Sequence, residues 1–193
     1  QYRCDALRPE PRYIIKEYRN YDERVNAVIE MIKYMPKPLI VYVIEPDTAN
    51  KYCKKLKSMG FTNVFSYTGD TSDTDRELLL EKWKANEFDV MIATSAFGMG
   101  VDKSNVRTIV HACVPENLSR FYQEVGRGGR DGLPSLSIMA MFTSKDDGRN
   151  DLSVAFGLVN KSILKKENLL IRLDSILRDQ RTLIEGDIIV ADL

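Results

Sequence analysis

The stretch that decides the fold is Val90–Gly100, which reads VMIATSAFGMG. It opens with a continuous apolar run, Val90–Ala93, as expected of a central parallel strand that is covered on both faces. The run passes directly into a loop that contains a Thr, a Ser and two glycines. Leu39–Ile44 is a second continuous apolar run of this kind. Buried strands of this type predict an α/β fold, in which helices cover both faces of a parallel sheet.

Outward from this stretch, strand-like runs alternate with amphipathic helical patterns. The predicted strands lie near Arg12–Tyr18, Leu39–Ile44, Val64–Tyr67, Val90–Ala93, Thr108–Ala112 and Leu136–Phe142. The predicted helices lie near Asp22–Tyr34, Asp47–Met59, Asp73–Ala85 and Leu118–Val125. Pro46 suits a first helical position, where its missing N–H costs nothing, and Gly60 suits a C-terminal cap. We expect Trp83 in the core rather than at a ligand.

After Phe142 the pattern changes. The polar residues 143–151 are typical of a surface linker. Lys161–Arg181 has the apolar spacing of an amphipathic helix, whose basic residues face either solvent, the favoured interpretation, or a partner. Ile188–Val190 is either a strand or an exposed stump where a parent chain was cut. We therefore predict an α/β lobe over residues 1–145 and a helical extension of unknown role over residues 146–193.

Composition restricts the possible partners and the compartment. The 193 residues include 28 Lys+Arg, 28 Asp+Glu and one His, so bulk electrostatics would not hold a polyanion, and any nucleic-acid contact must be local. Cys4, Cys53 and Cys113 form no CxxC pair, which argues against a zinc site or a disulfide framework and favours reduced thiols in the cytoplasm. No apolar run approaches the ~20 residues of a membrane span. The chain starts with neither an apolar segment nor a Met, as expected of a piece of a longer protein.

Two segments carry residues suited to chemistry, and we expect both beyond the carboxyl ends of strands. In the first, Gly98 and Gly100 permit the close approach of a phosphate, although a bare structural turn is an equal alternative. The second segment, residues 121–132, reads FYQEVGRGGRDG. Its glycines end a helix and leave Arg127 and Arg130, which point the same way if a helical turn persists. Guanidinium forks suit phosphoryl oxygens, while the alternative is a surface pair bonded to Asp131 and Glu124.

Together the two segments resemble motifs of superfamily 2 helicases. The pattern Gln-x-x-Gly-Arg-x-Gly-Arg, from Gln123 to Arg130, is similar to their motif six, and Ala93–Lys103 is similar to their motif five. The forms AFGMGVDK and FYQEVGRGGRDG resemble those of RecQ DNA helicases rather than those of DEAD-box RNA helicases. The resemblance covers about residues 8–142. It implies a RecA-like parallel sheet flanked by helices, the second lobe of a helicase motor, followed here by the helical extension.

The resemblance also implies roles for individual residues. Arg130 would be the arginine finger at the γ-phosphate of ATP, with Arg127 beside it and Gln123 linking the motif to the nucleotide cleft. The nucleotide-binding residues would be Asp102, Gly100, Gly126, Arg127 and Arg130. The residues that hold single-stranded DNA would be Thr94, Ser95 and Gly98. ATP with Mg²⁺ would be bound mainly by the first RecA-like lobe, which the resemblance places elsewhere in the same parent chain.

Three departures from the RecQ pattern limit what is carried over. Where that family has Tyr-Cys-x-Ser-Arg, this chain has Tyr42–Pro46, and the carboxylate of Glu45 would repel a DNA phosphate. Where the family has Tyr-His-Ala-Gly-Leu, this chain has Tyr67–Thr71, so the strand path or the affinity is expected to differ. No cysteine follows Cys113, so the extension is expected to lack the family's zinc subdomain and to bind no metal.

These observations predict the second motor lobe of an ATP-dependent RecQ-like DNA helicase or translocase, of the bacterial cytoplasm or nucleoid rather than the nucleus. Its partners would be single- or double-stranded DNA and the first lobe, and its pathway would be DNA repair, restriction or defence. The chain lacks a Gly-x-x-x-x-Gly-Lys-[Ser/Thr] loop and an Asp-Glu-x-His motif, so it is expected to be inactive alone. The alternatives are a non-catalytic binding module from a decayed helicase and an RNA-dependent ATPase of superfamily 2. His111 is expected to be a hydrogen-bonded structural residue rather than a metal ligand.

Overall fold

The computed structural model describes residues 11–98, 103–144, 150–154, 157, 183–185 and 188–190. The chain divides into two units, Gln1–Phe156 and Gly157–Leu193. In the second unit, β7 (Leu183–Glu185) and β8 (Ile188–Val190) form an antiparallel pair with Ile184 opposite Ile189. Of the two readings of residues 188–190, the strand is therefore the right one. The helix predicted over residues 161–181 lies outside the described residues.

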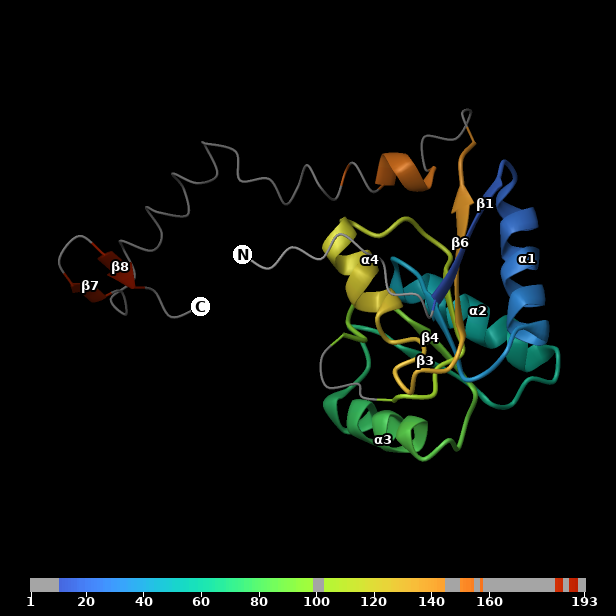
Figure 1. Cartoon of the computed structure of the whole chain (residues 1–193), viewed down its shortest axis with the longest axis horizontal. Helices are drawn as coiled ribbons and strands as arrows, with labels where there is room; N and C mark the ends of the chain where they lie inside the picture. The colour runs from blue at the N-terminus through green and yellow to red at the C-terminus, as the bar shows by residue number, and fades with distance from the viewer. Residues whose placement is uncertain are drawn as a thin grey trace. The chain divides into compact units, whose positions relative to one another are not determined.

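The first unit is built on a six-stranded sheet with the strand order β1-β6-β5-β2-β4-β3, in which every pairing is parallel. Its strands are β1 (Pro11–Tyr18), β2 (Leu39–Tyr42), β3 (Val64–Tyr67), β4 (Val90–Ala93), β5 (Thr108–His111) and β6 (Ser135–Phe142). The helices are α1 (Tyr21–Tyr34), α2 (Pro46–Ser58), α3 (Asp73–Lys84) and α4 (Leu118–Val125). Figure 1 shows α1 and α2 on one side of the sheet and α3 and α4 on the other. The predicted α/β class and the parallel sheet are confirmed.

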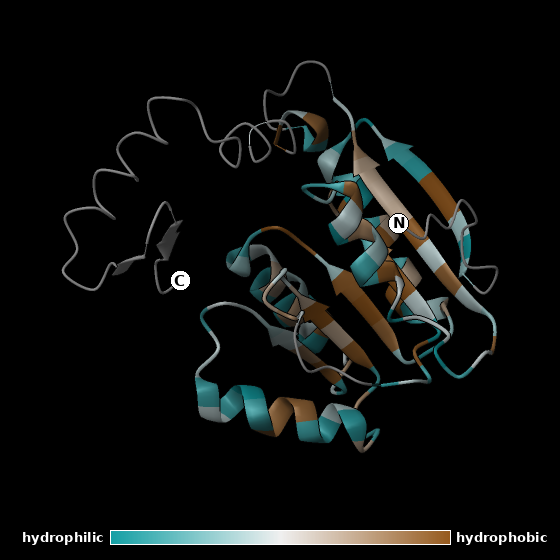
Figure 2. Cartoon of the chain, turned by 60° about the vertical axis from the view of Figure 1, so that its left-hand side comes forward, coloured by the Kyte–Doolittle hydropathy of each residue, from teal (hydrophilic) through white to brown (hydrophobic). Residues whose placement is uncertain are grey.

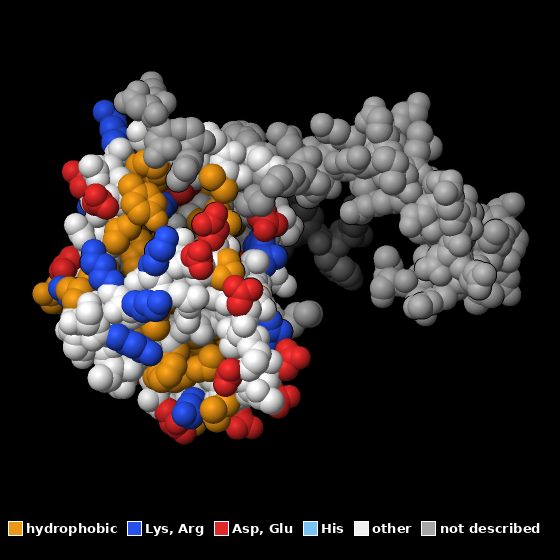
Figure 3. All heavy atoms as spheres, turned by 180° about the vertical axis from the view of Figure 1, so that it is seen from behind, with side chains coloured by type: hydrophobic (Ala, Val, Ile, Leu, Met, Phe, Trp, Pro, Cys, Tyr) orange, Lys and Arg blue, Asp and Glu red, His pale blue; other side chains and the backbone are white. Residues whose placement is uncertain are grey.

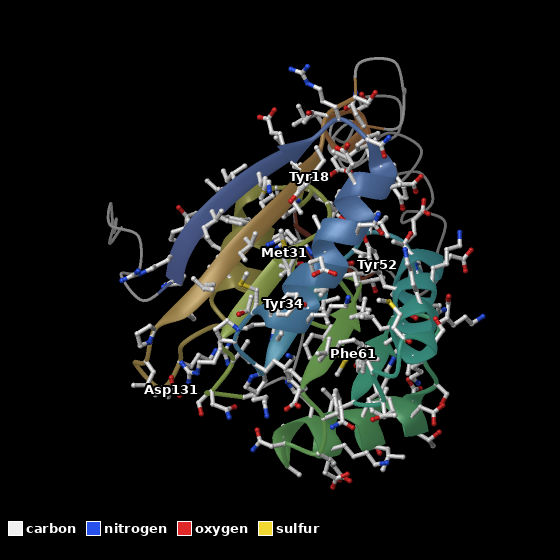
Figure 4. The ribbon with its side chains drawn as sticks, turned by 90° about the vertical axis from the view of Figure 1, so that its right-hand side faces the viewer. Tyr18, Met31, Tyr34, Tyr52, Phe61 and Asp131 are labelled. Atoms are coloured by element: carbon white, nitrogen blue, oxygen red, sulfur yellow. The ribbon has the colours of Figure 1, made fainter. Side chains whose placement is uncertain are left out.

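The two faces of the sheet have separate apolar cores, and the central strands contribute to both. On the first face, Leu39 and Val41 pack with residues of α1 and α2. On the second face, Ile40 and Tyr42 pack with Trp83. This alternation explains why β2 and β4 are buried at every position, and Figure 2 shows central strands of the sheet mostly in the hydrophobic colour. Figure 4 shows the first face, where Tyr52 belongs to the core and the partly buried Met31 and Phe61 pack against it.

The predicted elements agree with the observed ones to within one or two residues. β2 is the most shortened, ending at Tyr42 because the chain turns into α2 at Pro46. Pro46 is the first residue of α2, and Gly60 follows the capping residue Met59 with a φ of +89°, as predicted for both positions. Trp83 is fully buried, which confirms its assignment to the core. Among the described helices, none has the length and apolar content to cross a bilayer.

The prediction of a surface linker through residue 151 is wrong at its end. Asp151 is buried, and both of its carboxylate oxygens accept hydrogen bonds from Nη1 of Arg24, at 2.8 and 2.7 Å. One of these oxygens also accepts from the backbone N–H of Phe142 at 2.8 Å. Burial raises the pKa of Asp151, against the opposing effects of the Phe142 N–H and the Arg24 charge. A polar composition alone does not reveal this pairing, because the partner lies 127 residues earlier in the chain.

Candidate functional site

The first segment meets α4 and the second segment on the second face of the sheet, where Arg120 and Arg127 bind its backbone carbonyls. Nη2 of Arg120, on α4, donates to the carbonyl oxygen of Ser95 at 2.7 Å. Nη2 of Arg127 donates to the carbonyl oxygen of Gly98. The guanidinium of Arg127 also stands over the Phe97 ring, 5.8 Å from its centroid. The loop after β4 is therefore held by the helix and loop that carry the predicted catalytic arginines.

The positions of the two segments differ from the expectation that both lie beyond the carboxyl ends of strands. The first does, since residue 94 directly follows β4. The second begins on α4 beside the end of β5 but runs to the amino end of that strand. There Gly128 forms a parallel bridge with Val106, and Gly129 N–H donates to the Val106 carbonyl at 3.0 Å. The segment takes this course because α4 lies on a face of the sheet and delivers the chain to the start of β6.

Arg127 and Arg130 occupy different environments. Arg127 is only 4% exposed, whereas Arg130 is exposed and its Nε donates to the Gly126 carbonyl at 3.0 Å. The two arginines were expected to point the same way only if the helix continued through them, but α4 ends at Val125, before either arginine. Arg127 is therefore not one of a pair of surface arginines, as the alternative interpretation required. The two carboxylates in that interpretation bind other groups: Asp131 binds Arg107, and Glu124 binds Arg120 and His111.

The glycines of the second segment permit tight packing of its backbone. A Cβ on Gly126 would lie 2.9 Å from the Tyr122 carbonyl oxygen, and one on Gly128 would lie 3.0 Å from the hydroxyl of Ser135. Gly129 has a φ of +61°, and its Cβ would lie 2.7 Å from the Leu133 carbonyl oxygen. Side chains at these positions would clash, so the loop is held compactly against the strands.

The residues predicted to bind DNA are differently accessible. Thr94 is buried: its N–H donates to the Tyr67 carbonyl at 3.1 Å, and its hydroxyl accepts from Ala96 N–H at 3.4 Å. Ser95 is exposed, and Gly98 is half-buried. Gln123 is exposed on α4. Gly100 and Asp102 lie outside the described residues. The structure thus brings Gly98 against Arg127 of the second segment and Ser95 against Arg120 of α4.

A buried polar network behind α4 was not foreseen in full. His111, which is fully buried at the end of β5, contacts Glu124 Oε2 through Nε2 at 3.1 Å, confirming its role as a hydrogen-bonded structural residue. The other oxygen, Oε1, accepts from Nε of Arg120 at 3.3 Å. The imidazole stacks on the Tyr42 ring at a centroid distance of 5.4 Å. Burial raises the pKa of Tyr42, and the Arg127 charge opposes this shift. The position of His111 after an apolar run was the only sequence signal for the network.

Lys103 is a buried lysine whose role sequence reasoning missed. Nζ of Lys103 donates to the Trp83 carbonyl at 2.6 Å and to Asn86 Oδ1 at 2.5 Å. It also stands over the Trp83 ring, 4.8 Å from the centroid. Burial lowers the pKa of Lys103. Gly98 is therefore held by Arg127, and Lys103 is held by Trp83 and Asn86.

The two faces of the sheet also differ in the size of their cavities. A cleft of about 830 Å³ opens on the first face, lined by Arg24, Asp151, Glu45, Lys51 and Phe142 among others. Glu45, the carboxylate expected to repel DNA, is exposed at its rim. A smaller cavity of about 40 Å³ lies beside the network on the second face, lined in part by Tyr42, Ser95, Arg120 and Glu124.

Comparisons with known proteins agree with this geometry. The family described as helicase conserved C-terminal domain matches residues 23–132. The probable ATP-dependent DNA helicase RecS of Bacillus subtilis is 37% identical over 117 residues, which are 61% of this chain and 24% of the relative. The ATP-dependent DNA helicase RecQ of the same organism is 40% identical over 107 residues, 55% of this chain and 18% of the relative. The chain thus spans a quarter or less of the length of these relatives.

Solved structures share the fold at low sequence identity. The C-terminal domain of the DEAD-box protein Dbp5 matches with a TM-score of 0.62 and 19% identity, over 86% of this chain and 98% of that one. A DEAD box protein from the hyperthermophile Methanococcus jannaschii matches with a TM-score of 0.63 and 19% identity, over 78% of this chain and 40% of that one. At such identities the likeness extends to the fold, a RecA-like parallel sheet flanked by helices.

Proposed function

The chain belongs to the helicase conserved C-terminal domain family, with RecQ-type DNA helicases among its relatives, and from this premise we propose that it is the second motor lobe of an ATP-dependent DNA helicase or translocase. Its partners would be DNA and a first RecA-like lobe of the same parent protein. The first lobe would bind most of the ATP and Mg²⁺, and this lobe would complete the nucleotide site from the opposite side.

The observation that carries the proposal is the pair of arginine-to-carbonyl hydrogen bonds that join the first segment to α4 and to the second segment. Arg120 holds the Ser95 carbonyl and Arg127 holds the Gly98 carbonyl, so the predicted DNA-binding loop and the predicted nucleotide-binding loop are one packed unit. A motor needs such contact, because hydrolysis at one site must change the grip on the strand at the other.

The two arginines are proposed to divide the chemistry. Phosphoryl transfer is accelerated by positive charge placed where the transferred oxygens gain negative charge. Arg130, which is an exposed residue, would serve as the arginine finger toward a nucleotide on another lobe. Arg127 is buried against Phe97 and Gly98, so its proposed role is to fix the loop beside the finger. Gln123, exposed on α4, would contact the nucleotide cleft.

The proposed DNA contact is local and weak. On the face seen in Figure 3, basic, acidic and apolar side chains are interspersed, and the whole sequence has balanced charge. Thr94, Ser95 and the backbone near Gly98 would hold one or two phosphates. Each phosphate contact to a single strand contributes a salt slope of about −0.7, so the isolated chain should bind single strands with a shallow salt dependence.

The test is Arg130→Ala in the full-length protein that contains this chain. Because a finger contact strengthens as charge develops, the substitution should lower kcat by about 10³-fold or more and change nucleotide affinity far less. Arg19→Ala, at another exposed arginine, is the matched control and should retain turnover. Near-normal turnover by Arg130→Ala would reject the assignment. The isolated chain should hydrolyse no ATP, and a preference for RNA over DNA as activator would favour an RNA-dependent ATPase.

A further inference from the structure

We propose that Arg120 is a positioning residue that couples the DNA-binding loop to the arginine loop. This inference rests on the proposed function and assigns a role to a residue outside both motifs, since Arg120 precedes the Gln123–Arg130 pattern. Arg120, Glu124 and the Ser95 carbonyl that Arg120 holds form what we call the Arg120 bridge.

The first support is that the Arg120 bridge joins two separate backbone segments through one rigid group. Nη2 of Arg120 donates to the Ser95 carbonyl at 2.7 Å while its Nε donates to Glu124 Oε1 at 3.3 Å. The guanidinium is planar, so its two donors keep a fixed angle, and a displacement of Ser95 pulls on Glu124. Backbone N–H of Arg120 donates to the N-cap side chain of Asn117 at 2.8 Å, which fixes the start of α4 as well.

The second support is that Glu124 is fixed to the sheet. Its Oε2 contacts His111 at 3.1 Å, and His111 is fully buried and stacked on Tyr42. The buried Glu124–His111 contact therefore fixes α4 to the ends of β5 and β2, and Arg120 fixes it to the DNA-binding loop. Because α4 leads directly into the loop with Arg127 and Arg130, any shift of the helix against the sheet is passed to those arginines.

The third support is that the bridge has room to change. The Arg120 side chain is 28% exposed, whereas that of Glu124 is 9% exposed. Arg120 and Ser95 line the cavity of about 40 Å³ beside the network. Arg120 can therefore follow a movement of the loop when a strand binds at Ser95, and its bond to Glu124 passes that movement on to α4. Coupling between sites requires such an element with two arrangements.

The test compares Arg120→Gln with Arg76→Gln in the full-length protein. Arg76 is matched in chemistry, since its Nη2 donates to the Gly69 carbonyl at 2.7 Å and its Nη1 to Asp73 on its own helix, α3. Steady-state ATP hydrolysis is measured with and without an oligothymidine single strand. Arg120→Gln should lower maximal DNA-stimulated turnover about ten-fold, with basal turnover and half-saturating DNA each within about two-fold of wild type. Arg76→Gln should keep normal stimulation.

A double-substitution cycle separates coupling from simple loss of structure. Glu124→Gln keeps the shape of the side chain but removes the charge that orients Arg120. If the two act as one bridge, the double variant Arg120→Gln/Glu124→Gln should lose no more stimulation than the worse single variant. Arg120→Lys should not restore stimulation, because an ammonium lacks the planar fork.

Two results would overturn the inference: normal DNA stimulation in Arg120→Gln, or an equal fall in basal and stimulated turnover. The proposed function is tested separately by Arg130→Ala in the same assay. If Arg130→Ala abolishes hydrolysis and Arg120→Gln keeps its stimulation, the finger assignment survives and the bridge does not. If Arg130→Ala retains hydrolysis, the proposed function fails whatever Arg120 does.

Discussion

The two faces of the sheet are held together in different ways. On the first face, α1 and α2 cover a continuous apolar core. Arg24 and Asp151 form a buried ion pair on this face. On the second face, α3 and α4 cover a smaller core, and beside the Glu124 ion pairs three cationic side chains bind backbone carbonyls: Arg120, Arg127 and Lys103.

This difference indicates that the first face is a rigid scaffold and that the second face carries the loops of the proposed function. An apolar core and a buried ion pair strongly favour one arrangement, because any movement exposes apolar area or an unpaired charge. A hydrogen bond from a cationic side chain to a backbone carbonyl orients the side chain, but the side chain can keep this bond from several positions. The second face can therefore keep its loops ordered while they move, which suits the proposed coupling of nucleotide and strand.

The largest expected effect tests the first face. Arg24→Met leaves the carboxylate of Asp151 buried without its cation, and breaking a buried pair from one side costs about 3–5 kcal/mol. The free energy of unfolding should fall by that amount in equilibrium urea denaturation of the 193-residue chain. Lys33→Met is the control, because its ion pair with Glu30 on the same helix is exposed, and its effect should be much smaller. Equal effects would mean that the Arg24 pair is not part of the scaffold.

A smaller effect tests the second face through Gly129. Gly129→Ala places a Cβ 2.7 Å from the Leu133 carbonyl oxygen at a φ of +61°, so backbone strain and a clash together should cost about 1–3 kcal/mol. Gly132→Ala is matched, since Gly132 lies in the same loop with a φ of +79° and nothing within 4 Å of its Cβ. It should cost only about 1–2 kcal/mol, the left-handed backbone contribution. The difference between the two urea midpoints measures the clash, and its absence would show that the loop yields.

Sequence reasoning succeeded where a local pattern determines the structure. The runs at residues 39–44 and 90–93 predicted central strands because a strand covered on both faces has no polar positions. Pro46 and Gly60 marked the two ends of α2 through their own backbone restrictions. The motif-like segments indicated which loops to examine, and the structure brings them together.

Sequence reasoning failed where the partner of a side chain is distant or is a backbone atom. Nothing near Asp151 indicates that its cation is Arg24, 127 residues earlier. The carbonyls that Arg120 and Arg127 hold have no residue-type signature, since every residue carries one. The different burial of Arg127 and Arg130 depends on where α4 ends, and helix ends are uncertain by one or two residues in any pattern. Side-chain bonds to the backbone therefore needed the structure.

The smallest expected effect contrasts the two faces through pH. Burial raises the pKa of Asp151 from its ordinary 3.8, against the Phe142 N–H and Arg24. For Asp131 burial acts in the same direction, but the hydrogen bonds from Arg107 and Leu133 N–H hold the pKa below that value. Just above about pH 4, the folded chain therefore keeps a proton on Asp151 that the unfolded chain has lost. Just below about pH 4, Asp131 is ionised in the folded chain but protonated in the unfolded chain.

The two carboxyl groups should therefore change the pH dependence of unfolding in opposite directions. As pH rises through the window above about 4, Asp151 lowers the free energy of unfolding, because the folded state still binds the proton that the unfolded state has released. As pH falls below about 4, Asp131 lowers it, because the unfolded state binds the proton first. Urea unfolding across this range should show that Asp151→Asn removes the first loss and Asp131→Asn the second. If both variants changed the slope of the free energy of unfolding against pH in the same direction, the opposite pKa shifts of Asp151 and Asp131 would be refuted.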